Sequence, residues 1–168
     1  PRQDAKVDTH MAEAVSYQTS EELLSDVLLP YLHLVKEGVL DGVMTSHKRF
    51  TNIDPDFPAS LSKKVNDIIR RMGFNGFAIT DALWMMGILS KYGYTESKCL
   101  AIAGGNDLAL PFFKDNDQAF DAFVECWEQG MITEERLDEA VKRVLAAQAK
   151  TLREPKYTEV TEEDRKIF

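Results

Sequence analysis

The sequence lacks the features that define several large classes of protein. Its 168 residues contain no apolar run near the ~20 residues that a membrane-spanning helix needs. Basic residues are outnumbered 28 to 20 by acidic ones, and the net charge of −8 has the wrong sign for binding nucleic-acid phosphates. No phosphate-binding or dinucleotide-binding glycine motif occurs, and the 3 histidines are too scattered for a metal pair at helical spacing. We therefore expect no metal and no other cofactor.

Cysteine is also scarce. Cys99 and Cys126 are the only two, which is neither a disulfide framework nor a zinc pattern. Each lies in an apolar, helix-like segment, so we expect two reduced, buried thiols. Reduced thiols favour a reducing compartment such as the cytoplasm. Because residue 1 is Pro and not an initiating Met, a targeting segment upstream, and with it a secreted or cell-surface location, stays open.

What is present is the composition of a globular domain, 44% hydrophobic and 29% charged. Helical patterns alternate with short apolar segments. A capping-box pattern at residues 19–22 begins the first helix, Pro30 predicts a kink within it, and Gly38 ends it. The predicted strands are residues 42–46, 76–80 and 107–110, and the later helices are residues 58–72, 95–103, 116–129 and 133–150.

Strands that alternate with helices predict a parallel sheet with helical crossovers, an α/β fold. Three such strands cannot close a barrel, which commonly needs eight, and an open sheet leaves two unprotected edges. We therefore expect residues 1–151 to be part of a larger β/α domain, or a half that pairs with another copy. Residues 152–168 are charged and predict a tail or linker.

One candidate reactive group is Asp81, because sites in parallel α/β folds lie at the carboxyl ends of strands. It directly follows the apolar run 76–80 and precedes the bulky Trp84 and Met85. A carboxylate in that setting suits a nucleophile or acid in a sugar-binding site. An Asp that caps the following turn fits the pattern equally well.

Two further candidates contain histidine. Asp8 lies two residues before His10, where its carboxylate can orient the imidazole as a general acid/base, although the loop alone fits an incidental, solvated His better because the sequence shows no anchor for it. His47 follows the first predicted strand. Substrate contact and a structural hydrogen bond to a neighbouring loop are equally compatible with that position.

Taken together, these segments resemble glycoside hydrolase family 3, in particular its β-N-acetylglucosaminidase branch. Residues 4–10 resemble the loop with an Asp-x-His dyad, and residues 72–83 resemble the seventh barrel strand with the nucleophile. Similarity extends to residues 43–47 (sixth strand), 52–55 and 58–62 (the loop and helix start after it) and 101–110 (eighth strand). The resemblance covers residues 4–150, and the nucleophile segment is its most specific part.

The resemblance implies a (β/α)₈ TIM-barrel of which only the last three βα units are present, a half-barrel fragment. It implies a retaining hydrolase that removes terminal β-linked N-acetylglucosamine or a similar β-glycoside. Asp81 would be the nucleophile and His10, held by Asp8, the acid/base. The substrate-binding residues would be His47, Trp84 and Met85. Besides the carbohydrate substrate, the implied partners are the missing N-terminal half-barrel or a second copy.

The sequence departs from the family in two places. Ala82 stands where many relatives have a second acidic residue, and Trp84 is bulkier than the small residue expected there. The family's lysine–histidine segment is also absent. Because the acid/base is a His, phosphorolysis stays open beside hydrolysis. A non-catalytic carbohydrate-binding or truncated barrel subunit also stays open, as does an unrelated α/β domain in which Asp81 and His10 lie far apart.

Overall fold

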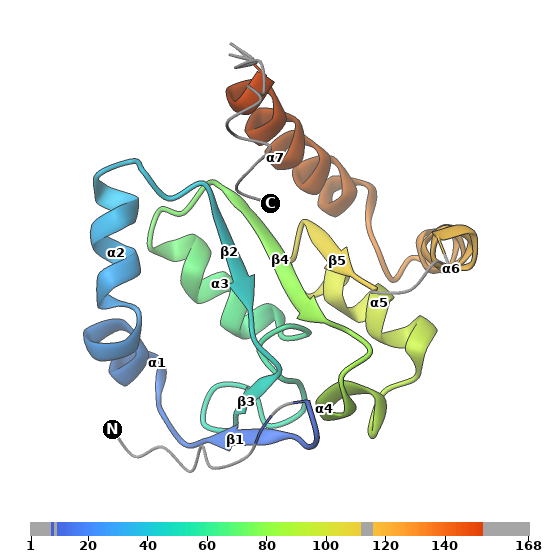
Figure 1. The fold of residues 1–168 in the computed structure, drawn as a ribbon, viewed down its shortest axis with the longest axis horizontal. Helices are drawn as coiled ribbons and strands as arrows, with labels where there is room; N and C mark the ends of the chain where they lie inside the picture. The colour runs from blue at the N-terminus through green and yellow to red at the C-terminus, as the bar shows by residue number, and fades with distance from the viewer. Residues whose placement is uncertain (1–7, 9, 112–115, 153–168) are drawn as a thin grey trace, which may run out of the picture.

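The computed structural model describes residue 8, residues 10–111 and residues 116–152, and it shows an α/β fold (Figure 1). Its centre is a parallel three-stranded sheet in the order β2-β4-β5, formed by β2 (Gly42–Thr45), β4 (Phe77–Ala82) and β5 (Leu108–Leu110). The helices α3 (Lys63–Arg71) and α5 (Tyr94–Ala103) make the crossovers and lie on the same side of the sheet. The predicted parallel sheet with helical crossovers is confirmed.

A second, two-stranded sheet was not predicted from the sequence. The strands β1 (Ala14–Ser16) and β3 (Lys48–Phe50) pair in parallel, with Ala14 opposite Lys48. Each strand has only 3 residues, and β3 begins with two basic residues. Segments this short and polar give no readable alternation, so only their pairing makes them strands.

The first helical segment is divided as Pro30 predicts. It consists of α1 (Ser20–Glu22), the π-helix η1 (Leu23–Val27) and α2 (Leu29–Lys36), with Pro30 in the first turn of α2, where its missing N–H leaves no helical bond unmade. The predicted capping box is present, since the Thr19 hydroxyl and the Glu22 carboxylate each accept from the other residue's backbone N–H.

Two predicted boundaries need correction, and one short helix was not predicted. The helix expected from residue 58 begins at Lys63, because the Ser62 hydroxyl caps it by accepting from the Val65 N–H. The strand β4 does not end before Asp81 but runs through it to Ala82, which pairs with Leu110 of β5. A short helix, α4 (Met86–Leu89), follows where a loop was expected.

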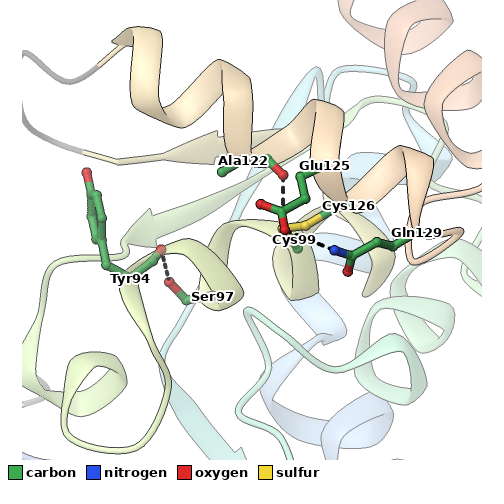
Figure 2. The surroundings of a disulfide bond; sticks show 7 residues. All are labelled: Tyr94, Ser97, Cys99, Ala122, Glu125, Cys126 and Gln129. Carbon is green, nitrogen blue, oxygen red and sulfur yellow. Dashed lines mark hydrogen bonds between the residues drawn. A yellow bond between two sulfur atoms is a disulfide. The ribbon is translucent and has the colours of Figure 1, made fainter.

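The cysteine prediction is wrong. Cys99 in α5 and Cys126 in α6 (Asn116–Glu128) form a disulfide across 27 residues of sequence, with their Cα atoms 6.1 Å apart (Figure 2). It lies in a small apolar cluster with Ile102 and Ile132. The packing of α5 against α6 brings the thiols together, and sequence spacing carries no signal of such a contact. Because disulfides persist in oxidising surroundings, the argument for a reducing compartment no longer holds.

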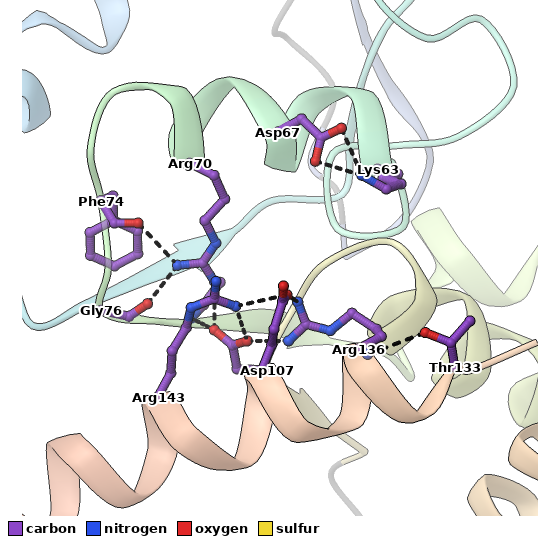
Figure 3. Close-up of polar contacts among 11 residues, drawn as sticks. Lys63, Asp67, Arg70, Phe74, Gly76, Asp107, Thr133, Arg136 and Arg143 are labelled. Atoms are coloured by element: carbon purple, nitrogen blue, oxygen red, sulfur yellow. Dashed lines mark hydrogen bonds and ion pairs between the residues drawn. The ribbon is translucent and has the colours of Figure 1, made fainter.

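The amino-terminal end of β5 is fixed by one buried carboxylate (Figure 3). The Asp107 side chain is fully buried and accepts from the guanidinium groups of Arg70 in α3 and of Arg136 and Arg143 in α7 (Glu134–Leu152), and from the Ala78 N–H. A single residue therefore ties two helices to two strands of the sheet.

Two apolar helix faces are largely exposed. One lies on α1–α2, and the other lines a groove of about 700 Å³ between α6, α7 and β5. Exposed members are Leu24, Val27, Tyr31, Leu34, Phe120, Trp127, Leu137, Val141 and Leu145. In the described part of the chain, no helix is both long and apolar enough to cross a membrane.

Candidate active site

Asp81 lies at the carboxyl end of β4, on the face of the strand opposite to its buried residues. Along β4, Ala78 and Thr80 are buried, whereas Ile79 and Asp81 are half-buried, the alternation expected when only one face of the sheet is covered. The Asp81 carboxylate accepts a hydrogen bond from the Ala82 N–H at 2.8 Å. On this uncovered face of the sheet the Asp81 carboxylate can reach a ligand.

The predicted Asp8–His10 dyad is formed in the structure. Asp8 Oδ1 lies 2.8 Å from His10 Nδ1 and also accepts from the His10 backbone N–H at 3.0 Å. The hydrogen bond from the backbone is the larger cause and the one from the ring the smaller, and together they hold the pKa of Asp8 below its usual value. With Nδ1 engaged by the carboxylate, Nε2 is the ring nitrogen left to meet a substrate, and at 64% the His10 side chain is well exposed.

The loop that carries the dyad has the anchors that the sequence did not reveal. The Met86 N–H, at the start of α4, donates to the His10 carbonyl at 3.2 Å. On the other side the chain enters β1, and Glu13 pairs with Arg49 of β3 at 2.8 Å. Arg49 also donates to the Pro55 carbonyl. These contacts join residues distant in sequence, so no local pattern could have predicted them.

The pKa of His47 is shifted by its burial and by the charged groups around it. Burial is the main cause that lowers the pKa of His47 from its usual 6.5, and a hydrogen bond to the Ala82 carbonyl opposes it. The negative charge of Asp81 also opposes the shift, whereas the positive charge of His10 adds to it. Both groups therefore lie within electrostatic reach of the same imidazole. The hydrogen bond from the Met86 N–H to the His10 carbonyl joins the dyad loop to the segment that follows Asp81, and this contact disfavours the hypothesis that Asp81 and His10 lie far apart.

His47 is enclosed and is not available to a substrate in this conformation. Its side chain is fully buried, with Nε2 2.9 Å from the Ala82 carbonyl and Nδ1 2.8 Å from the Ser60 hydroxyl. Because a carbonyl only accepts, Nε2 carries the proton and Nδ1 accepts from Ser60. The prediction of substrate contact is corrected: the ring is a brace for the backbone next to Asp81.

The two remaining predicted substrate residues differ in placement. Met85 is 1% exposed, so the prediction that it touches substrate is not supported, because its side chain packs inside the protein. Trp84 is half-buried and already makes contacts within the protein. Among the described residues, no group of three or more His, Cys, Asp or Glu side chains is arranged to hold a metal ion.

Comparisons with known proteins identify the family of the chain. The model of the glycosyl hydrolase family 3 N terminal domain matches residues 2–147. A beta-hexosaminidase of Tolumonas auensis is 32% identical over 107 residues, which cover 62% of this chain and 32% of that protein.

Solved structures give the same result. A glycoside hydrolase family 3 beta-N-acetylglucosaminidase from Paenibacillus sp. str. FPU-7 superposes with a TM-score of 0.79 at 32% identity, over 96% of this chain and 33% of that one. A beta-glucoside phosphorylase superposes with a TM-score of 0.76 at 30% identity, over 94% of this chain and 30% of that one. The chain thus spans about a third of the length of these relatives.

Proposed function

The chain belongs to glycosyl hydrolase family 3, and from this premise we propose that it carries the nucleophile and the acid/base of a retaining β-glycosidase. The observation that carries the proposal is the hydrogen bond from the Met86 N–H to the His10 carbonyl. It holds the loop of the Asp8–His10 dyad against the segment that follows Asp81. A nucleophile and a proton donor at one strand end are the two groups that glycosidic cleavage requires.

In the first step, the Asp81 carboxylate attacks the anomeric carbon while the bond from that carbon to the leaving oxygen breaks. The His10 imidazolium gives its proton to the leaving oxygen, and a covalent glycosyl-enzyme results. In the second step, neutral His10 takes a proton from water as the water oxygen attacks the anomeric carbon, which frees Asp81. Asp8, hydrogen-bonded to Nδ1, stabilises the imidazolium in both steps.

For the fold, we propose that residues 1–151 form the last three βα units of a (β/α)₈ barrel and that residues 152–168 are a charged tail or linker. Supporting observations are the parallel order β2-β4-β5, the two open sheet edges and the exposed apolar faces on α1–α2 and α6–α7. A site at the carboxyl ends of the strands is the usual arrangement in such barrels. Most of the tail, from residue 153, lies outside the described residues.

For the substrate, we propose a terminal β-linked N-acetylglucosamine, in line with the beta-hexosaminidase and beta-N-acetylglucosaminidase relatives. Phosphorolysis is the second candidate. A beta-glucoside phosphorylase is among the structural relatives, and a His in place of a carboxylate avoids repelling an incoming phosphate.

The test is turnover of an aryl N-acetyl-β-glucosaminide by the full-length protein, with Asp81→Asn as the control. We expect turnover that the substitution abolishes, and a covalent adduct on Asp81 with a slow fluorosugar. Turnover that rises with phosphate and yields a sugar phosphate would favour phosphorolysis. Sugar binding by calorimetry without turnover or adduct would favour a non-catalytic binding subunit instead.

A further inference from the structure

Two methionines stand exposed beside the proton donor. Met11 follows His10 directly and is 75% exposed, and Met86, whose N–H holds the His10 carbonyl, is 49% exposed. Most of the remaining exposed apolar side chains of the described residues lie on α1–α2 or on α6–α7. Exposed methionine at the dyad therefore belongs to neither apolar face and calls for its own explanation.

We propose that Met11 and Met86 form the apolar wall of the leaving-group subsite, and that the preferred substrates carry an apolar or aromatic aglycone. This inference rests on the proposed function. A general acid must lie within hydrogen-bond reach of the oxygen that it protonates. The first atoms of the aglycone beyond that oxygen therefore lie within a few ångströms of His10. Met11 is joined to His10 through the chain and Met86 through one backbone hydrogen bond, so their exposed side chains are the apolar groups proposed to border the aglycone.

The chemistry of methionine indicates the kind of selectivity. Its unbranched, polarisable thioether adapts to ligands of different shape and makes favourable contacts with aromatic rings. The two side chains are attached to different segments, the dyad loop and the start of α4, joined by one backbone hydrogen bond. Such a wall accepts varied apolar groups. It contributes little binding energy to a charged or strongly hydrated aglycone, because that aglycone would lose its hydration without gaining polar partners there.

The experiment compares two substrates with the same sugar and leaving groups of equal acidity, one carrying an alkyl-substituted ring and the other a ring with a charged substituent. The full-length protein is assayed with the variants Met11→Gln and Met86→Gln, which keep side-chain length but remove apolar character. Met131→Gln is the matched control, because Met131 is also exposed, at 41%, but lies between α6 and α7.

We expect each variant at the dyad to lower kcat/KM for the apolar substrate by about fivefold to tenfold. The charged substrate should be almost unaffected, so that the ratio between the two substrates changes. Met131→Gln should leave the ratio as it is. The rate at which a preformed fluorosugar adduct is hydrolysed should also not change, because the aglycone has already departed.

Equal losses on both substrates, or no loss on either, would overturn the leaving-group assignment while turnover by the parent protein leaves the proposed function standing. Absence of turnover and adduct in the parent itself would overturn the proposed function, and the aglycone wall with it. A changed ratio accompanied by an unchanged adduct lifetime would support both.

Discussion

The backbone N–H of Met86 donates to the carbonyl of His10 at 3.2 Å. It joins the segment after Asp81 to the loop that carries the dyad. The side chains of Asp8 and His10 are both well exposed, so their own ion pair contributes little rigidity. The position of His10 relative to Asp81 therefore depends on backbone contacts: this bond, the pairing of β1 with β3, and the brace that His47 gives to the Ala82 carbonyl.

The first prediction concerns the titration of Asp8. Hydrogen bonds from the His10 backbone and ring lower its pKa, so its carboxylate should stay ionised below the usual midpoint of 3.8. Replacing His10 with Ala removes the ring but keeps the backbone donor, which is the larger cause. The midpoint, followed by carboxyl NMR, should therefore rise only part of the way to 3.8. A midpoint at or above the usual value in the parent would show that the dyad does not form in solution.

The second prediction concerns His47. His47→Ala removes one of the two donors to the Ala82 carbonyl, leaves the buried Ser60 hydroxyl without its partner and opens a cavity, so the free energy of unfolding should fall by about 2–4 kcal/mol. Denaturant unfolding measures this loss. His33→Ala is the matched control, since His33 lies on the exposed helix α2 and should change stability by less than about 0.5 kcal/mol. An equal loss in both variants would contradict the role of His47 as a brace.

The pH dependence of stability gives a third prediction from the same residue. Burial lowers the pKa of folded His47 below 6.5, so the unfolded state binds the proton more readily. Stability from neutral His47 is therefore present above pH 6.5 and is lost as the pH falls from there toward the folded-state pKa. Unfolding curves between neutral and mildly acidic pH should show this loss, and a His47→Gln variant should lack it. The same slope in the variant would assign the effect to groups elsewhere in the protein.

Much of the fold could be predicted because its signals are local. The apolar runs before Asp81 and around Leu108 became β4 and β5, and the capping box at Thr19 began a helix where predicted. The dyad of Asp8 and His10 was identified through the family resemblance, since the local pattern alone fits an incidental histidine better. What could not be predicted depends on contacts between distant segments: the pairing of β1 with β3, and the bond that anchors His10.

The burial of individual side chains was the second feature that the sequence could not predict. Met85 and Met86 are neighbours of the same type, yet one is 1% exposed and the other 49%. Neither composition nor the nearby Asp81 distinguishes them, because the start of α4 decides which side chain turns inward. The prediction of reduced thiols failed for a related reason, since only the packing of α5 against α6 brings Cys99 to Cys126.

The fourth prediction concerns that disulfide. It closes a loop of 27 residues between α5 and α6, and such a crosslink stabilises a protein by about 3 kcal/mol, chiefly by restricting the unfolded chain. Reductant should therefore lower the unfolding midpoint in denaturant. The double variant Cys99→Ala with Cys126→Ala should start near the reduced midpoint and not respond to reductant. A response of the double variant equal to that of the parent would show that the disulfide is not the cause.

The fifth prediction concerns Asp107, which lies at the end of the sheet opposite to the dyad and should affect stability but not the chemistry. Asp107 is fully buried against three guanidinium groups, so Asp107→Asn removes the charge that offsets them and should lower the free energy of unfolding by about 3–5 kcal/mol. Asp67→Asn is the matched control, because the Asp67 carboxylate pairs with the exposed Lys63 and such a surface pair contributes about 0–1 kcal/mol. Denaturant unfolding compares the two variants.

Asp107 lies at the amino end of β5, whereas the dyad and Asp81 lie at the carboxyl end of β4, so the pH profile of any turnover that survives should keep its shape. A loss in Asp107→Asn no larger than in the control would mean that the three arginines are satisfied without the carboxylate.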